Sequence, residues 1–255
     1  MNRVNALFKR LAREHRCGLI AYVTCGDGDT VRIVDELEAA GADAIELGIP
    51  FSDPIADGLV IQAAAQRALA NGTTTKHVFD IARAIRVRSE IPLIAFSYLN
   101  PILRYGPERF AADAKTVGID SLLLTDLPPE VSADVRNAMH AQNLGCVFLL
   151  APTSTDARIK TVDKASDGFV YYLSTTGVTG AREKLDPALF ARLAEVRARL
   201  RKPIAVGFGI CRHEHYELLR EHCDAIVVGS AIVSAVAEGR SAGDVVREIL
   251  GRPEP

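Results

Sequence analysis

The segment "IELGIPFSDPIADG", residues 45–58, brings three carboxylates close together in the chain: Glu46, Asp53 and Asp57. Glu46 stands inside an apolar run typical of a buried strand, where an uncompensated charge is costly and the pKa of a carboxyl group rises. A carboxyl group whose pKa approaches neutrality can both accept and donate a proton. The segment therefore predicts acid/base chemistry that involves Glu46.

Each of these carboxylates also has a structural interpretation. Glu46 could be satisfied by a neighbouring hydroxyl, Asp53 could serve a turn, and Asp57 could serve a turn or cap the next helix. We favour a functional role for Glu46, whereas for Asp53 the structural interpretation is as good, and spacing alone does not decide for Asp57. Tyr171 could hydrogen-bond such a carboxylate, although core packing is the usual role of a strand tyrosine.

Glycine-rich or small-residue segments lie at the ends of the last three predicted strands, at 174–181, 207–210 and 229–233. A phosphate held by backbone N–H groups needs the chain to approach closely, and the start of a following helix favours negative charge. One such segment alone is typical of a turn. Three at successive strand ends predict a phosphate site, with these candidate residues: Gly180, Gly209, Gly229 and Ser230.

Eight short apolar runs predict the strands that must position these residues. They lie at 18–24, 43–49, 92–98, 120–126, 145–151, 168–174, 203–209 and 224–230. Apolar residues at helical spacing fill segments between them, at 30–42, 77–89, 108–118, 130–142 and 187–200. Strands that are apolar along most of their length are buried on both faces, as parallel strands covered by helices are. The pattern predicts an α/β fold, the (β/α)8 TIM barrel, with an extra N-terminal helix at residues 2–15.

The length of 255 residues with 48% hydrophobic content suffices for one large domain with a substantial core. Two small domains are the alternative. No linker rich in Pro, Gly or Ser interrupts the alternation, so we expect a single TIM-barrel domain over residues 1–255.

Charge and cysteine content exclude several classes of partner. The formal net charge of -2 and the interspersed charges offer no basic face for nucleic acid. We find no signal-peptide pattern and no apolar run near the roughly 20 residues that span a membrane, so we expect a cytoplasmic protein. The odd number of cysteines, without a Cys-x-x-Cys pair, argues against a disulfide framework and structural zinc. We expect mostly buried thiols at Cys17, Cys25, Cys146, Cys211 and Cys223.

The same motifs resemble those of the tryptophan synthase alpha subunit family. After "IELGIPFSDPIADG" come "IQAAAQRAL", "NPILRYG", "TDLPPE", "GVTGA", "GFGI" and "GSAIV", in the family's order and spacing between Leu19 and Val233. The first and longest motif is highly specific. The resemblance implies a carbon-carbon lyase of tryptophan biosynthesis, which cleaves indole-3-glycerol phosphate to indole and glyceraldehyde 3-phosphate without a metal or organic cofactor.

The resemblance also assigns roles to residues. It implies that Glu46 is the catalytic acid/base, that Asp57 is the catalytic aspartate, and that Tyr171 supports Glu46. It places the phosphate at Gly180, Gly209, Gly229 and Ser230, in agreement with the glycine pattern. We expect the walls around the indole to come from Tyr22, Tyr98, Leu99 and Phe208.

The family partner is a pyridoxal-phosphate-dependent beta subunit, so the resemblance implies an alpha2-beta2 complex. Contact is expected at Asp53, Pro54 and the segment 100–106. Some positions depart from the family pattern: Thr175 stands where an arginine is usual, Leu59 replaces a proline, and Cys25 and Gly28 change the loop after the first strand. These departures also allow a free-standing, indole-releasing paralogue.

Two further functions remain as alternatives. A barrel enzyme acting on another phosphorylated substrate would keep the phosphate glycines but not the pair Glu46 and Asp57. A non-catalytic regulatory subunit would keep the fold but tolerate loss of the carboxylates. Both carboxylates are present.

Overall fold

The computed structural model describes residues 2–173, 187–207 and 209–252. Its strands form one parallel sheet in the order β5-β4-β3-β2-β1-β9-β8-β7-β6. The strands are β1 Gly18–Thr24, β2 Ala44–Gly48, β3 Leu93–Ser97, β4 Ser121–Leu124, β5 Gly145–Val147, β6 Leu149–Leu150, β7 Val170–Leu173, β8 Ile204–Gly207 and β9 Ala225–Val228.

The two ends of this sheet meet through the chain itself. Only Phe148 separates β5 from β6; β5 pairs with β4, and β6 pairs with β7. The two short segments therefore occupy the place of one fifth strand, and the sheet is a nearly closed barrel of eight strand positions. This confirms the predicted (β/α)8 TIM barrel, and each predicted strand overlaps an observed one.

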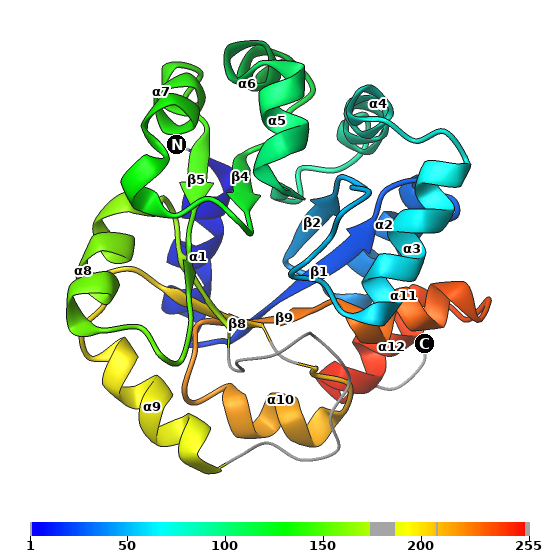
Figure 1. Cartoon of the computed structure of the whole chain (residues 1–255). Helices are drawn as coiled ribbons and strands as arrows, with labels where there is room; N and C mark the ends of the chain where they lie inside the picture. Colours follow the sequence, from blue (N-terminus) through cyan, green and yellow to red (C-terminus); the bar gives the residue numbers. More distant parts are fainter. Residues whose placement is uncertain (1, 174–186, 208, 253–255) are drawn as a thin grey trace.

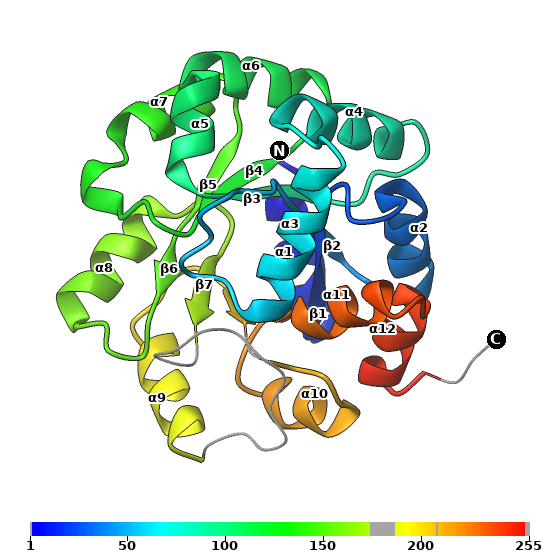
Figure 2. The same cartoon turned by 45° about the vertical axis from the view of Figure 1, so that its right-hand side comes forward.

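Helices surround the barrel (Figure 1). In the described residues they are α1 Arg3–Glu14, α2 Thr30–Ala40, α3 Leu59–Ala70, α4 Thr75–Arg86, α5 Leu99–Tyr105, α6 Pro107–Thr116, α7 Ala133–Ala141, α8 Asp156–Ala165, α9 Pro187–Arg197, α10 His213–Leu219, α11 Ser230–Ala237 and α12 Ala242–Leu250, with the short 3-10 helix η1 Pro129–Val131. Figure 2 shows α3 beside α11, so units from opposite ends of the chain are neighbours. No helix in the described part of the chain has the length and apolar character to cross a membrane.

The helix α1 confirms the predicted extra N-terminal helix and closes one end of the barrel. Asn2 caps it by accepting a hydrogen bond from the backbone N–H of Val4. Its buried side chains, which include Leu7 and Phe8, join the cluster inside the barrel, where Phe8 lies against Phe169 with ring centroids 5.0 Å apart. Apolar side chains therefore fill the barrel interior at the amino-terminal ends of the strands, and this end of the barrel is closed.

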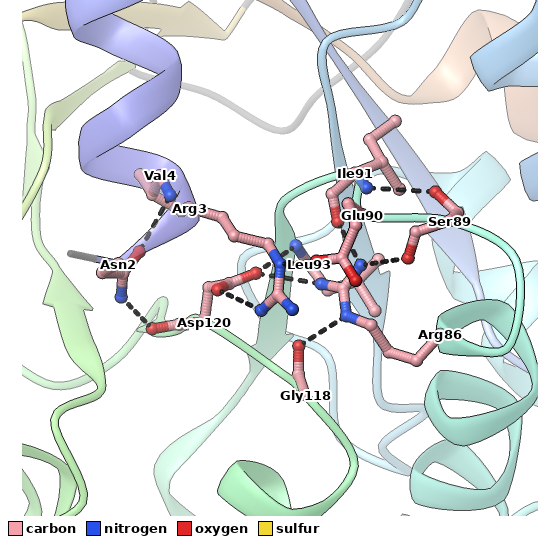
Figure 3. Close-up of polar contacts among 10 residues, drawn as sticks. All are labelled: Asn2, Arg3, Val4, Arg86, Ser89, Glu90, Ile91, Leu93, Gly118 and Asp120. Atoms are coloured by element: carbon pink, nitrogen blue, oxygen red, sulfur yellow. Dashed lines mark hydrogen bonds and ion pairs between the residues drawn. The ribbon is translucent and has the colours of Figure 1, made fainter.

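Asp120 ties α1 to this closed end (Figure 3). Its carboxylate lies 3.2 Å from Arg3 Nη1 and 3.0 Å from Arg86 Nη2, and it accepts a hydrogen bond from the backbone N–H of Leu93. The side chain of Asp120 is nearly fully buried, so these partners compensate a charge that would otherwise be costly there. The closed end is held by paired charges as well as by apolar packing.

Candidate active site

A cavity of about 100 Å³ opens at the carboxyl-terminal ends of the strands, opposite α1. In a barrel of this type this end carries the chemistry, because the loops that follow the strands converge there. Seven of the residues predicted for the site line the cavity: Tyr22, Glu46, Asp57, Tyr171, Gly209, Gly229 and Ser230. Tyr22 and Ser230, the first and last of these residues, are 208 positions apart in the sequence, so the fold brings distant parts of the chain together.

Glu46 is the most buried polar residue of this cavity. It lies in the middle of β2, its exposed fraction is 1%, and no described residue hydrogen-bonds to either carboxyl oxygen. Burial raises the pKa of Glu46 to about 8, because nothing nearby offsets the loss of water around the charge. At neutral pH the group is therefore mainly protonated and able to donate a proton.

Asp57 reaches the same cavity from the loop between β2 and α3. Burial raises the pKa of Asp57 to about 6, while a hydrogen bond with the Tyr98 hydroxyl lowers it. The Tyr98 hydroxyl oxygen also accepts a hydrogen bond from the backbone N–H of Ala56 at 2.9 Å, which holds this loop against the end of β3. At neutral pH Asp57 is mainly charged. One cavity thus holds two carboxyl groups in different protonation states.

Two tyrosines from β1 and β7 line the same cavity as the carboxyl groups. Tyr22 is the register partner of Glu46 in the pairing of β1 with β2, and Tyr171 comes from β7. Each hydroxyl lies over a glycine of the adjacent strand, so that a Cβ at Gly48 would collide with Tyr22 and one at Gly207 with Tyr171. Burial raises the pKa of both phenols, and nearby carboxylates raise it further. Both tyrosines therefore remain protonated hydrogen-bond donors.

Glycine and serine residues form a further part of the cavity lining. Gly229 precedes α11 and Ser230 is its first residue, so the N-terminus of this helix faces the cavity, and Gly209 lies beside them. Backbone N–H groups at a helix N-terminus favour an anion. Gly180, predicted to bind the phosphate, and Phe208, predicted to line the indole site, lie outside the described residues.

A comparison with known proteins identifies the family. The family model described as Tryptophan synthase alpha chain matches residues 8–250. The chain belongs to this family. The Tryptophan synthase alpha chain of Solibacter usitatus is 51% identical over 241 residues, which cover 93% of this chain and 90% of the relative. That of Geotalea uraniireducens is 43% identical over 254 residues, covering 98% and 94%.

Solved structures of tryptophan synthase have the same fold. The alpha subunit from Legionella pneumophila superposes with a TM-score of 0.89 at 33% identity, covering 98% of this chain and 97% of the other. A chain from Pyrococcus furiosus, from work on mutual activation of the tryptophan synthase a2b2 complex, gives a TM-score of 0.86 at 40% identity, covering 92% and 98%.

Some residues predicted for the site lie beside the cavity rather than in its lining. Tyr98 touches Asp57 instead of forming a wall. Leu99 begins α5, packs against the core outside the barrel, and donates its backbone N–H to Asp126 Oδ1 at 2.7 Å. Asp53 is exposed and accepts a hydrogen bond from Ser52 at 2.6 Å, as a turn residue does.

The apolar wall of the cavity is the part of the site that sequence reasoning missed. The additional lining residues are Ala56, Ile61, Phe96, Thr125, Leu149, Leu173, Gly207 and Val227. Several stand at or near the last residue of a strand and point inward, a position that the strand predictions contained. Phe96 meets Tyr22 edge to face, with ring centroids 5.2 Å apart. Among the described residues, no three or more His, Cys, Asp or Glu side chains gather as metal ligands do.

Proposed function

We propose that Glu46 and Asp57 are the catalytic pair of this protein. As a member of its family the chain is a lyase of tryptophan biosynthesis that cleaves indole-3-glycerol phosphate to indole and glyceraldehyde 3-phosphate. The observation that carries the assignment is the single apolar cavity that holds both carboxyl groups, with the pKa of Glu46 about 8 and that of Asp57 about 6. Paired groups with separated pKa values are suited to different acid/base tasks.

The reaction is a retro-aldol cleavage, in which the bond between indole C3 and the glycerol chain breaks. C3 must gain a proton, and the adjacent side-chain hydroxyl must lose one as the aldehyde forms. Glu46, mainly protonated at neutral pH, supplies the proton to C3, and its carboxylate then takes the proton of the hydroxyl. The same group is therefore restored at the end of the turnover.

Asp57 has a different task in this proposal. Protonation of C3 places positive charge on the indole ring, and a carboxylate that accepts a hydrogen bond from the ring N–H stabilises that charge. Asp57 is mainly charged at neutral pH, and Tyr98 holds it at the cavity through a hydrogen bond. We retain for Tyr171 the role of supporting Glu46, since the charge of the Glu46 carboxylate contributes to the raised pKa of this phenol.

The remaining lining residues suit the two ends of the substrate. Tyr22, Phe96 and Leu149 offer flat or apolar surface to the indole ring. We assign the phosphate to Gly209, Gly229 and Ser230, and retain Gly180 and Phe208 as predictions from the sequence. Since the phosphate lies away from the reacting carbons, its binding energy can fix the orientation of the substrate.

Indole release from indole-3-glycerol phosphate tests the catalytic pair. We expect Glu46→Gln to lower kcat by a factor of about 100 to 10,000, the usual contribution of general acid/base catalysis. Asp57→Asn should lower kcat more than it raises KM, because its hydrogen bond strengthens as charge develops. A Glu46→Gln variant that releases indole within twofold of the wild-type rate would remove Glu46 from the mechanism, and circular dichroism confirms that each variant is folded.

We further propose that a tryptophan synthase beta subunit binds beside the cavity mouth, giving the alpha2-beta2 complex. The solved relative from Pyrococcus furiosus belongs to work on such an a2b2 complex. Large apolar side chains are exposed in the segments that follow the strands at this end: Ile55 (81%), Leu59 (80%), Leu103 (54%) and Val131 (69%). Ile55 directly follows Asp53 and Pro54, Leu103 lies within 100–106, and Leu59 begins the helix after the same loop. Burial of such side chains would stabilise the complex.

Leu59→Asp tests this surface. We expect the substitution to weaken binding of a cognate beta subunit by about tenfold or more, because a charge would be buried at the interface. Val87→Asp is the matched control, since Val87 is equally exposed but follows α4 at the other end of the barrel. Equal loss of binding in both variants would show that Leu59 does not lie in the interface. A cytoplasmic location and a single domain over residues 1–255 remain predictions, and a free-standing paralogue is not favoured by the relatives.

A further inference from the structure

Two cysteines meet at the closed end of the barrel, far from the cavity. Cys17 directly precedes β1, and Cys223 lies two residues before β9. Their sulfur atoms are 3.8 Å apart, although the residues are 206 positions apart in the sequence. The strands β1 and β9 are the first and the last of the barrel, and they pair in register from Gly18 and Ala225 onward. The two thiols therefore lie beside the pairing of the first strand with the last.

The backbone around the pair is well anchored. The N–H of Gly18 donates to the carbonyl oxygen of Asp224 at 2.9 Å, and the hydroxyl of Tyr216 donates to the carbonyl oxygen of Cys17 at 3.2 Å. The Cys223 thiol lies 3.3 Å from the carbonyl oxygen of Leu219. These contacts keep the two sulfur atoms beside each other in the folded protein.

We propose that Cys17 and Cys223 form an oxidation site, at which a small peroxide converts the two thiols into a disulfide that joins the first and last strands of the barrel. The inference does not depend on the proposed lyase mechanism, because neither cysteine touches the cavity.

The geometry requires only a local movement. A disulfide bond is about 2 Å long, so the sulfur atoms must approach each other by less than about 2 Å. Cys17 belongs to the short connection between α1 and β1, and Cys223 belongs to the connection between α10 and β9. Side-chain rotation and small shifts of these connections can supply the approach, while the paired strands stay in place.

The chemistry balances with hydrogen peroxide as the oxidant. The sulfur of Cys17 attacks one peroxide oxygen, the O–O bond breaks, and the departing hydroxide leaves with the thiol proton as water. The sulfur of Cys223 then attacks the sulfenic acid on Cys17, the S–O bond breaks, and a second water leaves with the second thiol proton. Two electrons pass from the sulfur pair to the peroxide.

Burial determines which oxidants can act and how fast. The exposed fractions of Cys17 and Cys223 are 5% and 4%, so a bulky disulfide such as oxidised glutathione is excluded where a peroxide can enter. The hydrogen bond with Cys17, together with burial, raises the pKa of the Cys223 thiol. A protonated thiol is a poor nucleophile, so we expect the attack of Cys223 on the sulfenic acid to be slow.

The cross-link has a predictable physical effect. A disulfide restricts the unfolded chain more strongly the longer the loop that it closes, and this one encloses most of the chain. We expect the Tm to rise by roughly 5 °C or more. The cavity lies at the opposite end of β1, so lyase activity at ordinary assay temperature should stay unchanged.

The experiment uses the full chain with Cys211→Ser, which removes the half-buried cysteine and leaves the four buried ones. The folded protein is treated with hydrogen peroxide and digested without reduction, and mass spectrometry then searches for the peptide that joins Cys17 to Cys223. Thermal unfolding is recorded before oxidation, after it, and after reduction with dithiothreitol. We expect the linked peptide, a higher Tm, and its reversal by the reductant.

Variants separate this cross-link from other oxidation. Cys17→Ser and Cys223→Ser should each abolish the rise in Tm, whereas Cys146→Ser, which removes a buried cysteine of β5, should retain it. Absence of the linked peptide from the folded protein, or its appearance only in urea, would overturn the proposal. If a serine variant does not fold, the linked peptide in the Cys211→Ser protein still decides. Glu46→Gln, which should remove lyase activity, should retain the linked peptide and the rise in Tm on oxidation.

Discussion

Buried carboxyl groups at the two ends of this barrel differ in the hydrogen-bond and charge partners that surround them. At the closed end, Asp120 contacts two arginines and a backbone N–H, and Asp43 contacts Arg10 and Arg16. At the open end, Glu46 is as deeply buried, yet no described residue hydrogen-bonds to its carboxyl oxygens. The same chemical group is therefore compensated at one end and left without described hydrogen-bond partners at the other.

We infer from this difference that the paired carboxylates stabilise the fold, whereas the carboxyl group without described partners serves the reaction. A buried charge with partners contributes a fixed link between elements, and removal of one partner is costly because the other remains behind. A buried carboxyl group without partners raises its own pKa and destabilises the charged folded state. At the open end this cost makes proton transfer possible near neutral pH. The comparison predicts opposite effects of amide substitutions at the two ends.

The largest expected change in stability comes from Asp120→Asn at the closed end. The substitution leaves the Arg86 guanidinium, whose side chain is 10% exposed, without its charge partner. We expect the free energy of unfolding to fall by about 3 to 5 kcal/mol. Urea unfolding monitored by circular dichroism measures this change.

Glu90→Gln is the matched control within the same cluster (Figure 3). Glu90 also pairs with Arg3, at 2.6 Å, but its side chain is 80% exposed. Water and salt screen an exposed ion pair, so we expect a much smaller loss of stability than for Asp120→Asn. Equal losses in the two variants would show that burial does not distinguish these carboxylates, and the comparison of the two ends would fail.

Glu46→Gln should act in the opposite direction and increase stability. The pKa of Glu46 is about 8 in the folded protein, against 4.5 as its ordinary value. The folded state therefore binds this proton more tightly than the unfolded state does. The resulting stability is fully present below pH 4.5 and is lost as the pH rises towards 8.

The glutamine cannot titrate, so this loss should disappear in the variant. At pH 7 we expect Glu46→Gln to be more stable than the wild type by about 3 kcal/mol, with little difference near pH 4.5. Urea unfolding of both proteins across this range provides the test. A difference that does not change with pH would show that Glu46 keeps an ordinary pKa in the folded protein.

The barrel could be predicted well from the sequence because most strands are recognisable as short apolar runs. Runs such as 18–24 are apolar along most of their length, and the observed β1 has the same bounds. The division of the fifth strand at Phe148 has no local signal, because the run 145–151 is continuously apolar. Short helices such as α5 and α10 were not predicted, since seven residues give too little periodicity.

The candidate site divides in the same way. Glu46 could be selected because a charge within an apolar run is unusual at the level of sequence. Tyr98 was expected to be a wall, whereas its hydroxyl meets Asp57 and Ala56 from a different unit of the barrel. No pattern within either segment encodes that contact, which arises only when the barrel closes. The assigned roles of the site residues remain proposals.

Tyr98→Phe gives the smallest expected effect and sharpens the comparison within the open end. Asp57 differs from Glu46 in having a hydrogen bond, and the Tyr98 hydroxyl supplies it. Loss of this hydrogen bond should raise the pKa of Asp57 above about 6 by roughly one further unit, since such a bond contributes about 1 to 1.5 kcal/mol.

The consequence appears in the pH profile of indole release. Because Asp57 acts in its charged form, its raised pKa should move the acid side of the kcat profile to higher pH, with a loss of about tenfold at pH 5 to 6 and little loss at pH 8. Tyr172→Phe is the control, since its buried hydroxyl has no partner among the described residues and faces away from the cavity. If Tyr98→Phe lowered kcat equally at every pH, the hydroxyl would be positioning the loop rather than setting the charge of Asp57, and the contrast between Asp57 and Glu46 would need another cause.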